Sequence, residues 1–212
     1  MNKLYAVCLS IIFILSSSAL FAVEKEFTGK LGTSYSHKLD NWGLDVSLNY
    51  MYKLDPWFVA GFEGDFYWVR WEKLLGTKEE PIGVYKEIIS DSDAFVVPMF
   101  FNAQVRLPFL VKKIYVEPYV TVGLGYTLMI LTYKQPSFVD SNTGETFEKQ
   151  SINDFHHGFA WQFLASVAFK PGEDSRIKFI ADFGYRGTSP EKDNVKVNLS
   201  GMLMRLGVQF DI

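Results

Sequence analysis

The segment FFNAQVRLPF, residues 100–109, alternates polar and apolar side chains. One face carries two amides and a guanidinium, from Asn102, Gln104 and Arg106. The opposite face is apolar: Phe101, Ala103, Val105 and Leu107. A period of two indicates a β-strand with two unlike faces. The fold class therefore depends on which of these faces meets the surroundings and which meets the interior.

The same alternation recurs through most of the chain after residue 24. It marks segments of about ten to fifteen residues bounded by turn-forming residues, as expected of strands. Eight such segments can be delimited: 26–37, 42–53, 57–71, 94–107, 114–132, 155–170, 175–187 and 196–212. This pattern predicts an all-β protein, an eight-stranded antiparallel up-and-down β-barrel.

The segment IYVEPYVTVGLGYTLMIL, residues 114–131, is apolar enough to suggest a transmembrane helix. Pro118, two glycines and a β-branched run disfavour a helix and suit a strand. We therefore interpret it as a strand. Its predicted inward face comprises Glu117, Tyr119, Thr121, Gly123 and Gly125.

The predicted connections alternate between short and long. Short turns rich in Pro, Gly and charge cover 53–56, 108–113 and 170–174. Longer polar loops are expected at 72–93, 133–154 and 188–195, while 37–41 is as short as a turn. Short turns at one end and longer loops at the other are typical of outer-membrane barrels, whose short turns face the periplasm.

Charge placement indicates that the apolar face points outward to lipid. Its mid-strand positions carry no ionised side chain, and a Lys or Arg there would cost about 2–4 kcal/mol at the bilayer midplane. The polar face carries charges of both signs, which suits an enclosed interior where ions must pair. We therefore predict a transmembrane barrel whose lumen contains a network of paired charges. The network comprises Asp45, Glu63, Arg106, Glu117, Asp182, Arg186 and Arg205. Because Arg106 belongs to this network, we expect Arg106→Leu to lower barrel stability.

The N-terminus has the features of a secretory signal peptide. Lys3 precedes an apolar run that is shorter than the ~20 residues needed to span a bilayer. Small residues follow, and cleavage is expected after Ala22. The sequence thus predicts a signal peptide over 1–22 and one barrel domain over 23–212. The only cysteine, Cys8, lies within the leader.

Three strand phrases resemble those of small eight-stranded outer-membrane proteins, a group that includes the OmpA barrel domain, OmpX and OmpW. They are GFEGDFYW (61–68), VPMFFNAQVRLPF (97–109) and EPYVTVGLGY (117–126). The resemblance implies a location in the bacterial outer membrane. It also implies recognition of the C-terminal strand by the outer-membrane assembly machinery. Family members typically end in an aromatic residue, whereas this chain ends in Ile212, with Phe210 two places earlier.

The predicted function is non-enzymatic: a structural or surface-interacting membrane barrel, with a narrow passage or a binding site for small solutes as a further option. An alternative is an OmpW-like channel for small hydrophobic molecules. That alternative requires an apolar lumen pocket, for which the inward positions are Tyr67, Val69, Val96, Pro98 and Phe100. Ordinary packing beneath the loops is the competing interpretation of those residues.

A lipid A-modifying enzyme is the third class considered. His157 lies near Ser151 and Glu148 in the sequence, but no compact nucleophile–base motif appears. His156 and His157 are instead expected to cap a loop. No third ligand stands at metal-binding spacing, and no nucleotide-binding glycine loop is present, so neither a metal nor a cofactor is expected.

The composition indicates which classes of partner to expect. The net charge of −3 gives no indication of a nucleic-acid partner. The aromatic fraction of 17% is high enough to supply interfacial girdles. One girdle is expected to contain Trp42, Tyr50, Tyr52, Trp57 and Phe58. We expect a monomer whose partners are the lipids of the outer membrane and the assembly machinery.

Overall fold

The computed structural model describes residues 24–79, 85–108, 115–135, 138–139, 146–148, 150–172, 175–193 and 195–212. Its long strands are β1 (Lys25–Ser36), β2 (Asn41–Lys53), β3 (Phe58–Glu79), β4 (Tyr85–Arg106), β5 (Val116–Gln135), β8 (Gln150–Phe169), β9 (Ile177–Thr188) and β12 (Gly201–Asp211). Four two-residue strands lie between them: β6 (Phe138–Val139), β7 (Thr146–Phe147), β10 (Glu191–Lys192) and β11 (Val195–Lys196). In this part of the chain, no helix has the length and apolar character to cross a membrane. The predicted signal peptide, 1–22, lies outside the described residues.

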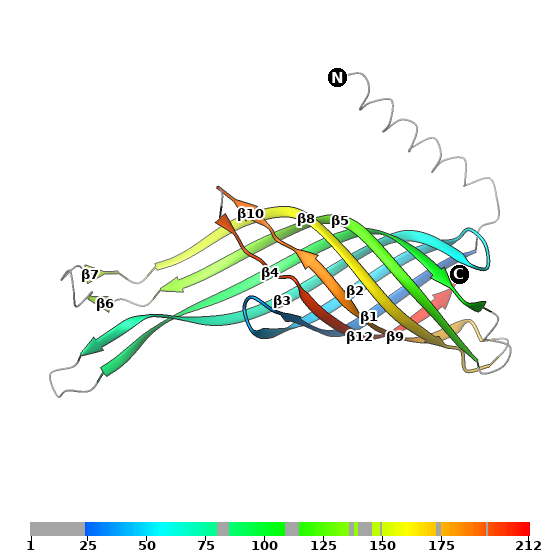
Figure 1. Cartoon of the computed structure of the whole chain (residues 1–212), viewed down its shortest axis with the longest axis horizontal. Helices are drawn as coiled ribbons and strands as arrows, with labels where there is room; N and C mark the ends of the chain where they lie inside the picture. Colours follow the sequence, from blue (N-terminus) through cyan, green and yellow to red (C-terminus); the bar gives the residue numbers. More distant parts are fainter. Residues whose placement is uncertain are drawn as a thin grey trace, which may run out of the picture.

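The eight long strands form a closed barrel (Figure 1). Each pairs antiparallel with its neighbours in the sequence of long strands, and β8 pairs with β9. The barrel closes where β1 meets β12, from Glu26↔Asp211 to Ser36↔Gly201. The predicted eight-stranded antiparallel up-and-down barrel is therefore confirmed.

The two faces of each strand have the predicted orientation. In β4, the Phe101 side chain is 47% exposed on the outside, whereas Asn102 is fully buried inside. The same inside–outside alternation runs through β2, β9 and β12. The barrel is thus apolar outside and polar through much of its interior. This is the reverse of a soluble barrel.

One end of the barrel, here called the turn end, holds the connections between β2 and β3, between β4 and β5, and between β8 and β9. The start of β1 and the end of the chain meet there, since the Ile212 N–H donates to the Lys25 carbonyl at 2.8 Å. The turn after β2 is held by Asp55, whose Oδ1 accepts the N–H groups of Trp57 and Phe58 at 2.6 and 2.8 Å. This is the Asx-turn geometry that favours Asp at such a position.

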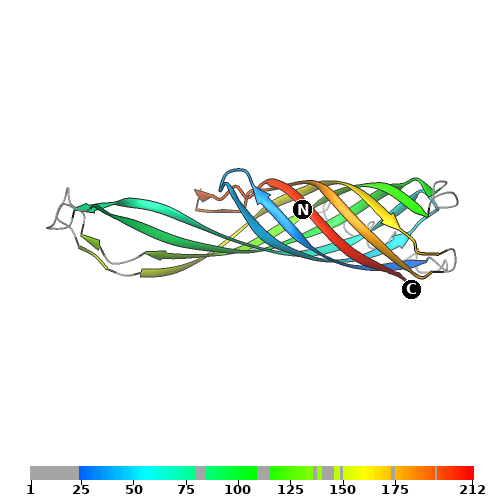
Figure 2. The same ribbon diagram turned by 90° about the horizontal axis from the view of Figure 1, so that it is seen from below.

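The opposite end differs from the sequence prediction. The segments 72–93 and 133–154, expected to be loops, largely continue as paired strands. β3 and β4 pair out to Glu79↔Tyr85, and β5 and β8 pair out to Gln135↔Gln150. We call this extension, formed by 71–79, 85–93, 131–135 and 150–155, the projecting sheet. Figures 1 and 2 show its hairpins reaching well beyond the barrel.

Two further sequence predictions are corrected at this end. His156 and His157 lie within β8 and do not cap a loop. Trp42 was grouped with Tyr50 and Tyr52, but it lies at the other end of β2, where its ring is 5.1 Å from that of Tyr35. Neighbouring aromatics can belong to opposite rims because a strand of this length crosses the whole barrel.

Candidate functional site

The polar lumen begins at the turn end with a pair between Arg106 and Glu26. Two guanidinium nitrogens of Arg106 donate to the two carboxylate oxygens of Glu26 at 2.8 and 2.6 Å. One of these nitrogens also donates to Gln104 Oε1 at 2.8 Å. Both charged residues are buried. A bidentate geometry of this kind is the strongest form of ion pair.

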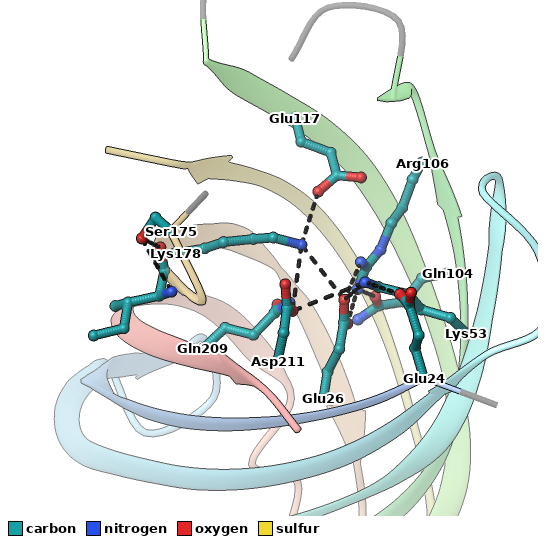
Figure 3. A network of polar contacts seen from close by, with 11 residues as sticks. Glu24, Glu26, Lys53, Gln104, Arg106, Glu117, Ser175, Lys178, Gln209 and Asp211 are labelled. Atoms are coloured by element: carbon teal, nitrogen blue, oxygen red, sulfur yellow. Dashed lines mark hydrogen bonds and ion pairs between the residues drawn. The ribbon is translucent and has the colours of Figure 1, made fainter. Parts of the chain in front are cut away.

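Lysines extend this pair into a wider network. Lys178 Nζ lies 3.4 Å from Glu117 and 3.5 Å from Glu26. Lys53 Nζ lies 3.4 Å from Glu26 and 2.9 Å from Glu24. Figure 3 shows these side chains converging from several strands. The turn-end network comprises Glu24, Glu26, Lys53, Arg106, Glu117, Lys178 and Asp211.

Glu24 precedes the first strand, and the hydrogen bond that it accepts from Lys53 lowers the pKa of its carboxyl.

A second network lies in the middle of the barrel around Arg205. One of its nitrogens is 2.7 Å from Glu63 and 3.2 Å from Asp65, and the other is 3.3 Å from Asp182. Arg186 lies beside it, at 2.8 Å from Asp45 and 2.5 Å from Asp65. Lys30 completes the group at 2.6 Å from Asp182. This mid-barrel network comprises Lys30, Asp45, Glu63, Asp65, Asp182, Arg186 and Arg205, whose paired side chains are at most 2% exposed.

Amides connect this network to the far wall of the lumen. Asn102 donates to Glu63 at 2.7 Å, and Gln162 donates to Asn102 at 3.1 Å. Gly123 lies between these amides, and a Cβ there would be 2.2 Å from Asn102 Oδ1. The absence of a side chain at Gly123 therefore leaves room for the amide contact.

An apolar cluster fills the lumen beyond the mid-barrel network. Its buried members are Tyr67, Val69, Ala94, Val96, Met129 and Leu199. Leu199 comes from the connection between β9 and β12, so this connection packs into the cluster at the end of the barrel opposite the turns. A smaller apolar group, Tyr119, Ala168 and Ile180, lies between the two networks.

The predicted lumen residues are all buried inside the barrel, but the structure places them in two networks. Arg106 and Glu117 belong to the turn-end network, and the other five belong to the mid-barrel network. Sequence reasoning missed Glu26, Lys30 and Asp65. Period two could have found them, because Asp65 shares a strand face with Glu63, and Glu26 and Lys30 share a face of β1.

The predicted apolar pocket is only partly assembled. Tyr67, Val69 and Val96 join the apolar cluster. Phe100 and Pro98 are also buried but lie outside that cluster. Among the described residues, no group of three His, Cys, Asp or Glu side chains could hold a metal ion.

No family model and no curated protein matches the chain. Its fold is similar to that of Neisserial surface protein A (NspA), with a TM-score of 0.51 and 13% identity over 90% of this chain and 97% of that one. A major outer membrane protein from Thermus thermophilus aligns with a TM-score of 0.47 and 12% identity, over 89% and 99% of the two chains. Ail of Yersinia pestis, solved with the heparin analogue sucrose octasulfate, gives a TM-score of 0.44 and 19% identity, over 90% and 97%. The likeness to NspA confirms the fold of the small outer-membrane barrels.

Proposed function

We propose that this protein is a non-enzymatic barrel of the bacterial outer membrane that holds the projecting sheet at the cell surface for contact with a partner. The apolar exterior of the barrel and the fold shared with NspA support the membrane location. The features of a signal peptide over 1–22 support export, with removal of the leader after Ala22.

The observation that carries this proposal is the pair of open edges on the projecting sheet. The pairing of β2 with β3 ends at Leu44↔Trp68, so the described residues of β3 beyond it have a strand on one side only. Similarly, β8 pairs with β5 from Gln150 onward but first meets a strand on its other side at His157. Unpaired backbone groups on such an edge can hydrogen-bond an added strand.

The filled lumen supports a scaffold more than a pore. Two ion networks and an apolar cluster follow one another along the barrel axis, and an eight-stranded barrel is about wide enough for side chains alone. Packing of Leu199 against the apolar cluster also favours a structural role over an OmpW-like hydrophobic channel. A planar bilayer containing the protein should therefore show no steady conductance; stable single-channel steps would support the narrow-passage alternative.

The remaining proposals concern chemistry and partners. We expect no enzymatic activity, which an assay for fatty-acid release from lipid A would test. The outer-membrane lipids would contact the exterior, and β12 would carry the signal for the assembly machinery. The protein would be a monomer, and sedimentation in detergent would test that.

The first experiment establishes the membrane barrel. Residues 23–212 would be refolded in detergent and compared, boiled and unboiled, on a denaturing gel, with a far-ultraviolet dichroism spectrum. A β spectrum and a heat-dependent mobility shift are expected. A β-rich protein that remains soluble without detergent would overturn the membrane location.

The second experiment tests the open edges with a phage-displayed library of random linear peptides. Bound peptides should protect backbone amides of 71–79 or 150–156 from hydrogen exchange. A matched variant that replaces 72–92 and 133–152 by short turns keeps the barrel pairings and should lose peptide binding. Retained binding by this variant, or protection elsewhere only, would refute the proposed use of the sheet.

A further inference from the structure

A cleft of about 1020 Å³ lies beside the outer part of β8. The connection between β9 and β12 folds back to form one wall, and β10 pairs with β8 at Glu191↔His157. Backbone hydrogen bonds fix this connection, from Leu199 to Thr188 and from Val197 to Pro190, both at 3.0 Å. The described backbone of this connection therefore builds the cleft, which begins at Phe155 where the open edge of β8 ends.

Aromatic side chains form the apolar wall of the cleft. Phe159 and Trp161 point outward and are 61% and 42% exposed. The Trp161 indole packs over Gly187, where a Cβ would lie only 2.1 Å from the indole nitrogen. Its ring also stacks on Tyr185, with centroids 5.6 Å apart. The glycine and the tyrosine thus hold the indole in one position.

His157 adds a positioned polar group to the same wall. Its ring stacks on Tyr126 with centroids 5.8 Å apart, and the Tyr126 hydroxyl hydrogen-bonds to Nδ1. When that hydroxyl donates, the proton of a neutral imidazole resides on Nε2. His157 then offers an N–H donor to a molecule in the cleft.

The rim of the cleft is charged but balanced. It carries two carboxylates, Glu191 and Asp193, and two ammonium groups, Lys192 and Lys196. Lys196 lies 3.2 Å from Glu191. Lys192 pairs with Asp154, and this hydrogen bond raises the pKa of the Lys192 amine. The four rim charges sum to zero, and Asp154 beside Lys192 adds one negative charge, so the rim offers donors and acceptors without attracting a polyanion.

We infer that this cleft binds a neutral sugar ring. A pyranose has an apolar C–H face, which suits an exposed indole, and a rim of hydroxyls that both donate and accept hydrogen bonds. The cleft has the matching parts: an aromatic wall, an imidazole nitrogen and paired charges within one concave site. The sugar could belong to a free glycan or to the headgroup of a membrane glycolipid, since both present the same chemistry.

Calorimetry on the full protein in phosphocholine detergent would test the free-glycan source, with maltohexaose and chitohexaose as neutral probes and sucrose octasulfate as the polyanion. Trp161→Ala should weaken binding of a neutral probe by about tenfold or more. Trp68→Ala is the matched control, because Trp68 is similarly exposed at 40%, stacks on Phe95 and lies outside the cleft. Glu191→Gln tests the rim without removing an aromatic ring and should also weaken binding.

A second arm tests the glycolipid source. The protein would be reconstituted in phosphatidylcholine with glucosyl diacylglycerol, extracted, and its co-purified lipid quantified by mass spectrometry. Enrichment of the glycolipid that Trp161→Ala abolishes and Trp68→Ala preserves would identify the lipid headgroup as the sugar source. Absence of binding in both arms, equal losses in the two tryptophan variants, or preference for sucrose octasulfate would overturn the inference. None of these readouts depends on peptide binding to the projecting sheet.

Discussion

The guanidinium carbon of Arg186 lies 5.8 Å from the centroid of the Tyr67 ring. The terminal nitrogens of the same guanidinium pair with Asp45 and Asp65. Both Arg186 and Tyr67 are buried. Arg186 therefore contacts the carboxylates of the mid-barrel network on one side and the Tyr67 ring of the apolar cluster on the other. Because the face of an aromatic ring attracts a cation, this contact joins two layers of opposite polarity.

Substitutions of Tyr67 separate the ring from its hydroxyl. The hydroxyl is buried and has no hydrogen-bond partner among the described residues. Tyr67→Phe keeps the ring and should leave the free energy of unfolding unchanged or slightly higher. Tyr67→Leu removes the ring and should lower it by about 1–3 kcal/mol. Urea titration in lipid vesicles, followed by tryptophan fluorescence, would measure both. Equal losses in the two variants would contradict the role given to the ring.

Arg205→Leu should be strongly destabilising. It removes the cation shared by Asp45, Glu63, Asp65 and Asp182, and leaves buried carboxylates short of positive charge. Breaking a buried pair in this way costs about 3–5 kcal/mol. Arg70→Leu is the control, because Arg70 pairs with Asp91 at 2.9 Å but is 54% exposed, and it should cost under about 1 kcal/mol. Similar urea midpoints for the two variants would argue against the mid-barrel network.

Arg106→Leu should destabilise the barrel less than Arg205→Leu. Its partner Glu26 keeps Lys53 and Lys178 within 3.5 Å, so the expected loss is roughly 2–3 kcal/mol. A double-mutant cycle with Glu26→Gln should show coupling of at least about 1 kcal/mol, because the two side chains form a bidentate pair. Additive losses in the same urea titration would mean that the pair contributes little by itself.

Gly123→Leu should push apart the amides that cross the lumen. A side chain there would collide with Asn102 and with Gln162, whose Cγ would lie 2.8 Å from the new Cβ. Overpacking of this kind costs about 1–3 kcal/mol. Gly64→Leu is a matched control on the outside of β3, where no atom lies within 4 Å of an added Cβ. Retention of full stability by Gly123→Leu would show that the amide contact is dispensable.

The sequence predicted the barrel because most of its strands separate two environments. Alternating burial in β2, in residues 94–106 of β4 and in the first half of β9 follows because the outer face and the lumen face have different surroundings. Prediction from alternation failed at the projecting sheet, which was expected to form loops. Asp91, Ser92 and Asp93 lie in a paired strand, yet no apolar period marks them. A strand that leaves the barrel no longer separates an apolar exterior from a polar lumen, so its composition resembles that of a loop.

The sequence by itself determined the number of barrel strands and which face of each points inward, because period two records the side on which a residue is buried. It did not determine which charges meet. Arg106 binds Glu26 on a distant strand, whereas Arg205 gathers four carboxylates at mid-height. Those partnerships depend on the stagger between neighbouring strands in the closed barrel, which sets the height of each residue along the axis. Only the tertiary structure fixes that stagger, and with it the division of the lumen into two ion networks and an apolar cluster.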